Sequence, residues 1–101
     1  MKRVYAPRAL RDVDEILAYV QARSPKGAAT LSVAIEQATG SCALNPFLGT
    51  ATDTRGIFRY PLTRHDYTIF YRVLADLDEV EIVRVIHAAR IKDLGRLPDD
   101  D

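Results

Sequence analysis

Near its C-terminal end, the chain contains RVIHAAR (residues 84–90), in which His87 stands three positions before Arg90. Imidazole titrates near neutral pH and serves as a general acid or base, whereas guanidinium groups bind phosphate oxygens. Metal-independent RNA cleavage uses the ribose 2′-OH as nucleophile and needs a base, an acid and cations around the phosphate. The two residues are therefore a candidate catalytic pair. The alternative is that they form the rim of a sheet.

Three further residues have side chains that suit this reaction, and all lie in predicted strands. Arg59 and Arg84 are candidate phosphate-binding cations, and Tyr67 opens a strand. In the structural interpretation, the arginines are solvated or paired, Tyr67 packs against helices and His87 is hydrogen-bonded at the end of its strand. His65, in the sequence TRHD, is then simply a turn residue. The residue types alone leave both interpretations open.

The metal-ligating residues of the chain are few and scattered. Cys42 is the single cysteine, which excludes an intrachain disulfide and a cysteine-based metal cluster. His65 and His87 are far apart in the sequence and lack clustered carboxylates, so they make a poor ligand set. We expect no metal and no cofactor. Cys42 lies on an apolar helical stripe and is predicted to belong to the core.

The composition indicates one small domain. The 101 residues suit a single domain over 1–98, followed by an acidic tail, 99–101, that we expect to be disordered. Lys and Arg total 14, as do Asp and Glu, so the net charge is zero, whereas proteins that grip nucleic acid are usually basic. A local basic patch is still possible. The sequence has no signal-peptide pattern and no long apolar run, which predicts a cytoplasmic protein without membrane contact.

Two helices are predicted in the first half of the chain, after a short strand over 2–6. Apolar residues at helical spacing indicate a helix over about 8–22. The stripe consists of Leu10, Val13, Ile16, Leu17 and Val20. The acidic residues of this helix, Asp12 among them, are predicted to lie off the stripe. Ser24 and Pro25 are typical of a second helix start, and the sequence NPFLG (45–49) ends that helix. The short connection predicts an antiparallel helical hairpin.

The second half changes to the alternation typical of strands. The segments 56–62, 66–74 and 80–87 are rich in β-branched and aromatic residues and are joined by short turns. Short connections favour an antiparallel meander, and Pro61 predicts that the first of these strands is an edge strand. The expected fold is α+β, in the order β-α-α-β-β-β. It has a single twisted, mainly antiparallel sheet with the helical hairpin packed on one face.

Taken together, these segments resemble the RelE/ParE superfamily of toxins from bacterial type II toxin–antitoxin pairs. The likeness covers residues 3 to 92 and rests on the hairpin ending in NPFLG, the arginine in FRYPL, and the strands YTIFYRV and EIVRVIHAAR. The resemblance implies one of two activities. RelE-like members are ribosome-dependent mRNA endonucleases, whereas ParE-like members poison DNA gyrase. Both are neutralised by a small antitoxin that folds onto the toxin.

The chain is more similar to the ParE branch, on its P–G loop, its Y-x-I-x-Y strand and its H-x-x-R sequence. The zero net charge and the scattered lysines (Lys2, Lys26, Lys92) also favour that branch, for which no catalytic residue is expected. In the RelE-like alternative, the site is His87, Arg59, Arg84, Arg90 and Tyr67. A toxin fold that has lost toxicity and only binds its antitoxin is a third interpretation.

Overall fold

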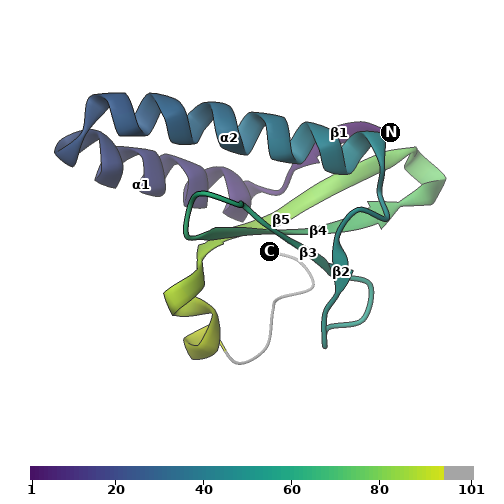
Figure 1. The fold of residues 1–101 in the computed structure, drawn as a ribbon. Coiled ribbons are helices and arrows are strands. Elements are labelled where there is room, and N and C mark those ends of the chain that lie inside the picture. Colours follow the sequence, from purple (N-terminus) through teal and green to yellow (C-terminus); the bar gives the residue numbers. More distant parts are fainter. Residues whose placement is uncertain (95–101) are drawn as a thin grey trace.

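The computed structural model describes residues 1–94 (Figure 1). The last part of the predicted domain and the tail at 99–101 lie outside these residues. The elements follow one another as β1 (Lys2–Tyr5), α1 (Pro7–Arg23), α2 (Pro25–Leu44), β2 (Thr50–Ala51), β3 (Phe58–Pro61), β4 (Tyr67–Leu74), the 3₁₀ turn η1 (Ala75–Leu77), β5 (Glu79–His87) and the 3₁₀ segment η2 (Ala88–Leu94).

A single residue, Ser24, joins the two long helices. Its backbone N–H closes α1 on the carbonyl of Val20 at 2.7 Å, and its hydroxyl accepts the N–H of Gly27 at 2.9 Å, which caps α2. Pro25 occupies the first helical position of α2, where a missing N–H costs nothing. The helices therefore fold back as an antiparallel hairpin, which covers one face of the sheet (Figure 1).

The five strands form one sheet in the order β1-β5-β4-β3-β2. β1 runs parallel to β5, and the other neighbours are antiparallel, which confirms the predicted α+β fold with a mainly antiparallel sheet. The prediction that the strand containing Pro61 is an edge was wrong, because the unpredicted strand β2 pairs with Phe58 and Arg59. Pro61 is tolerated because it lies beyond the two residues that β2 pairs.

Two apolar clusters lie on opposite faces of the sheet. The larger cluster fills the space between helices and sheet, and its fully buried members include Ala9, Cys42, Ile69, Tyr71, Val80 and Ile82. The smaller one lies on the other face, where Ile91 of η2 packs against it, and it consists of Ile57, Phe70, Val83 and Ile86. β4 is thus buried on both faces in its middle, at residues 68–71.

The apolar stripe of α1 is shifted from the predicted one. Leu10, predicted in the core, is 51% exposed, and Asp12, predicted on the solvated face, is buried. Ala9 takes the core position at the start of the helix, where the short side chain lets α1 approach the sheet closely. Asp12 is buried because it has partners on β5, described below.

Tyr71 holds the turn that follows α2. Its hydroxyl accepts the N–H of Gly49 and donates to the carbonyl of Pro46, both at 2.8 Å. A Cβ on Gly49 would lie 2.6 Å from the carbonyl oxygen of Arg59, so this position requires glycine. Beneath the turn, Cys42 is buried as predicted, and burial raises the pKa of its thiol to about 11. The thiol is therefore protonated and unreactive at neutral pH.

No helix within residues 1–94 is long and apolar enough to cross a membrane.

Candidate functional site

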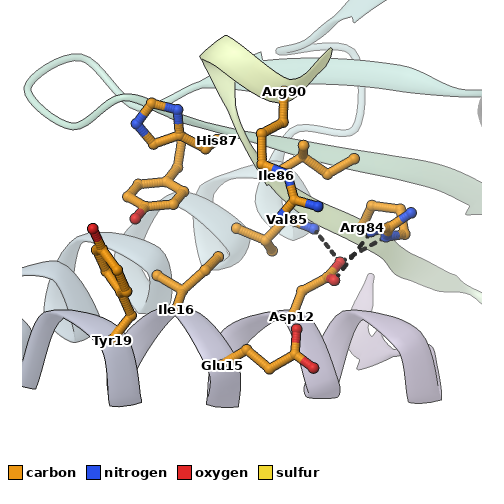
Figure 2. Close-up of a pocket in the computed structure, with 10 residues that line it drawn as sticks. Asp12, Glu15, Ile16, Tyr19, Arg84, Val85, Ile86, His87 and Arg90 are labelled. Carbon is orange, nitrogen blue, oxygen red and sulfur yellow. Dashed lines mark hydrogen bonds and ion pairs between the residues drawn. The ribbon is translucent and has the colours of Figure 1, made fainter. Parts of the chain in front are cut away.

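A cavity of about 450 Å³ opens between α1 and the end of β5 (Figure 2). Ile16 and Tyr19 of α1 form one wall, and Val85 and His87 form the opposite wall. Tyr67 and Ile86 also line the cavity, together with charged side chains from α1, β5 and η2: Asp12, Glu15, Arg84 and Arg90. The cavity therefore combines an apolar wall with two carboxylates and two guanidinium groups.

Asp12 is the centre of the hydrogen bonds at this cavity. Its carboxylate accepts the Nε of Arg84 at 2.7 Å, the Nη2 of the same residue at 3.2 Å and the backbone N–H of Val85 at 3.0 Å. Arg8, one turn earlier on α1, adds a longer contact of 3.5 Å. A buried carboxylate is tolerable when it is paired with a cation and hydrogen-bonded, and Asp12 meets both conditions.

The end of β1 explains why a helix side chain bonds to a strand. β1 pairs with β5 up to Ile82, and the chain then turns into α1. The N–H of Val85 lies beyond the end of β1, where a buried unpaired donor would be costly. Asp12 supplies the acceptor that a longer β1 would have supplied. The Asp12 carboxylate thus satisfies the backbone N–H of Val85 at the part of β5 that β1 does not pair.

A β-bulge in β5 places Arg84 within reach of Asp12. The register with β4 shifts between Phe70, which faces Arg84, and Tyr71, which faces Ile82, so Val83 is the extra residue. Bulges redirect side chains and bend the strand locally. Here the Arg84 guanidinium lies against α1 in a bidentate contact with Asp12 (Figure 2). Its charge is compensated inside the protein.

His87 and Tyr67 are cross-strand partners at the end of the sheet. Their rings meet edge to face, with centroids 5.1 Å apart and an angle of 86°. The Nδ1 atom of His87 accepts the backbone N–H of Ala89 at 3.1 Å, so a neutral ring carries its proton on Nε2. Burial, followed by the neighbouring Tyr19 and Asp66, raises the pKa of the Tyr67 phenol. Tyr67 is therefore a hydroxyl donor rather than a phenolate.

The structure brings four of the five predicted site residues together and separates the fifth. Tyr67, Arg84, His87 and Arg90 line the same cavity. Arg59 lies elsewhere: it is the cross-strand partner of Phe70, which belongs to the cluster on the other face of the sheet. The fifth candidate is therefore across the sheet from the other four. His65 lies in the turn between β3 and β4, as predicted.

Sequence reasoning missed Asp12, Glu15 and Tyr19, which complete the cavity. The signal for Asp12 was its position, because it stands three residues after Ala9 and four before Ile16, on the buried side of α1. Within residues 1–94, no group of three or more His, Cys, Asp or Glu side chains is placed to hold a metal ion.

Solved structures place this architecture among toxins of toxin–antitoxin systems. A chain of the chromosomal ParDE system from P. aeruginosa superimposes with a TM-score of 0.75 at 20% identity, covering 86% of this chain and 95% of that one. A chain of the intact E. coli RelBE toxin–antitoxin complex gives 0.65 at 15% identity, covering 86% and 95%. The isolated E. coli RelE toxin gives 0.66 at 15% identity, covering 92% and 89%. The fold is that of the RelE and ParE toxins.

The sequence assigns the chain to a particular family within this fold. The family model described as the ParE toxin of the type II toxin–antitoxin system parDE matches residues 4–92. The chain belongs to this family. A comparison with curated protein sequences gives no match.

Proposed function

We propose that this toxin stops cell growth by poisoning DNA gyrase and that a cognate antitoxin neutralises it. The observation that carries the proposal is the ion pair between Asp12 and Arg84. Stabilising a phosphate in a transition state needs cations that are free to approach it. Arg84 is held by a buried carboxylate, and Arg59 lies on the other face of the sheet. The two arginines predicted to bind phosphate at an RNA-cleaving site are thus neither free nor together, which favours a mechanism that works by binding.

A ribosome-dependent mRNA endonuclease is the second candidate, and one observation favours it. His87, Tyr67 and Arg90 line a single cavity, and the imidazole contacts the phenol ring. With Nδ1 engaged by Ala89, the Nε2 atom of His87 is left for proton transfer, and the Tyr67 hydroxyl is a possible donor. In this mechanism Arg90 would be the phosphate cation.

The antitoxin is proposed from two observations. The ParDE and RelBE structures that this chain resembles are toxin–antitoxin systems by their descriptions. In addition, Leu44 and Phe47 are 87% and 81% exposed beside the turn that Tyr71 holds in place. An aromatic side chain presented on a fixed turn is typical of an interface anchor. We propose that the antitoxin covers this apolar surface.

Pulse-labelling of DNA and protein synthesis just after induction of the chain separates the two mechanisms. We expect DNA synthesis to stop first while protein synthesis continues, and we expect the His87→Ala variant to remain toxic at equal expression. Protein synthesis that stops first, together with loss of toxicity in His87→Ala, would establish the nuclease instead. Unchanged synthesis of both kinds would indicate a chain that has lost toxicity.

The partner is tested in the same cells. A reading frame that neighbours the toxin gene and encodes a small protein with a DNA-binding N-terminal part is the antitoxin candidate. Its co-expression should restore growth, and its product should purify together with the toxin. Growth that stays arrested while both proteins are present would contradict the proposed neutralisation.

A further inference from the structure

The charges of this neutral chain are separated between its two ends. The segment 16–35, which contains the turn between α1 and α2, has no acidic residue and includes Arg23 and Lys26. The connection from β4 to β5 instead carries two acidic residues, Asp76 and Asp78, and β5 begins with a third, Glu79. Figure 1 shows the helical turn and the β4–β5 connection at opposite ends of a molecule whose longest extent is 40 Å. The zero net charge is therefore the sum of a basic end and an acidic end.

A second cavity, of about 580 Å³, lies at the basic end. Four parts of the chain line it: the end of α1, the first two turns of α2 with Ser24 before them, the turn from β3 into β4, and the end of β5. They contribute two cations and both histidines of the chain, namely Lys26, Arg64, His65 and His87. Among the lining residues, all of them within the described part of the chain, Asp66 is the single carboxylate.

The two cations of this cavity are distinguished by lining one cavity together, because the lack of an ion-pair partner is shared, within the described part of the chain, by six other basic residues: Lys2, Arg11, Arg23, Arg55, Arg59 and Arg90. Arg3, Arg72 and Arg84 each form an ion pair with a carboxylate. Neither Lys26 nor Arg64 has a carboxylate within ion-pair distance among the residues that the structure describes. Both are exposed. The first turns of the 20-residue helix α2 line the same cavity, so the positive end of the helix dipole adds to the field of the side chains. The fold thus gathers uncompensated positive charge there.

We propose that the basic end, defined as Lys26, Arg64, His65 and His87, is a contact site for the phosphate backbone of double-stranded DNA. Convergent cations that lack internal partners are the electrostatic signature of phosphate binding. Single strands are instead bound by stacking of bases on open aromatic faces. Tyr67, which lines this cavity, already meets the ring of His87 edge to face, and Tyr19 of α1 carries the guanidinium of Arg23 at 3.7 Å from its ring centroid. The inference goes beyond the proposed function, because it holds whichever target the toxin has.

The test measures binding of the full chain to a short fluorescently labelled DNA duplex. Fluorescence anisotropy gives the Kd at salt concentrations of roughly 50–200 mM. Non-specific contacts of this kind give a Kd of about 10⁻⁴–10⁻⁶ M, and each neutralised phosphate adds about 0.9 to the slope of log Kd against log salt. We expect the variant Lys26→Gln/Arg64→Gln to lower this slope by about 2. The matched control Lys2→Gln/Arg55→Gln removes the same charge away from the cavity and should leave the slope unchanged.

Three outcomes would overturn the proposal. Equal loss in both double variants would show that net charge, rather than this site, sets the affinity. Wild-type chain without measurable affinity for the duplex would exclude the contact. Binding of poly-glutamate as strong as binding of the duplex, lost in the same variant, would identify a site for acidic protein segments instead. All four substituted side chains are exposed, so each variant should fold, and circular dichroism checks this.

Discussion

Two ion pairs on β5 have almost the same length and different surroundings. Arg84 and Asp12 approach to 2.7 Å with side chains that are 10% and 6% exposed. Arg72 and Glu81 approach to 2.6 Å across the β4–β5 ladder with side chains that are 29% and 20% exposed. Water screens the second pair and solvates either partner when the other is removed. Water replaces a lost partner of the first pair far less well, because α1 and the end of the sheet cover nearly all of both side chains although they border the cavity.

The comparison teaches that distance does not rank ion pairs, whereas burial and additional hydrogen bonds do. Asp12 balances a guanidinium and also accepts the N–H of Val85, so its removal leaves a buried cation and a buried donor unsatisfied. Among the described residues, the side chain of Glu81 forms a hydrogen bond with Arg72 and with no other residue.

Replacing Asp12 with asparagine should have the largest effect. The substitution keeps the size of the side chain and leaves the Arg84 charge buried without compensation. The expected loss in free energy of unfolding is about 3–5 kcal/mol, a large part of the roughly 5–15 kcal/mol that a small domain has. Urea unfolding of wild type and variant measures it. A loss below about 1 kcal/mol would mean that water reaches the pair and that the contrast with Arg72–Glu81 is unfounded.

The double variant Asp12→Leu/Arg84→Met sharpens the comparison. It removes both charges and fills the space with apolar groups, so the cost that remains is the unpaired N–H of Val85, about 1–3 kcal/mol. We expect the double variant to be more stable than Asp12→Leu alone. A double-mutant cycle gives the coupling energy. If the two single losses simply add, the residues do not act as a pair.

Glu81→Gln should have the smallest effect. Exposed and half-exposed pairs contribute about 0–1 kcal/mol, and salt screens that contribution. Urea unfolding at low and high salt should show a small loss that shrinks as the salt concentration rises. A loss comparable with that of Asp12→Asn would contradict the ranking by burial.

The sequence predicted the helices and the long strands because their apolar residues repeat at the spacing of each element. It did not predict β2, since two residues, Thr50 and Ala51, are too few for a periodic signal. The position of Asp12 was missed for a different reason. Its partner Arg84 stands 72 positions later, and a carboxylate next to a polar helix face looks solvated until that partner is known.

The candidate site was predicted in part. Tyr67 was predicted to open a strand and His87 to lie at the end of the next one, and the structure shows that both line one cavity with Arg90. The position of Arg59 on the other face was present in the sequence, since it alternates with the apolar Phe58 and Tyr60. The basic end could not be predicted, because Lys26, Arg64 and the two histidines converge only through the fold of the hairpin over the sheet.

The parallel pairing of β1 with β5 also sets the timing of folding during synthesis. Lys2 pairs with Glu79, so the first strand stays without its neighbour until nearly the whole described chain has left the ribosome. Synthesis proceeds at about 5–20 residues per second, and contacts this distant in sequence form late. The Asp12–Arg84 pair and the cavity above it depend on the same strand. The sheet that positions Asp12 against Arg84 is therefore complete only in molecules whose synthesis has passed β5.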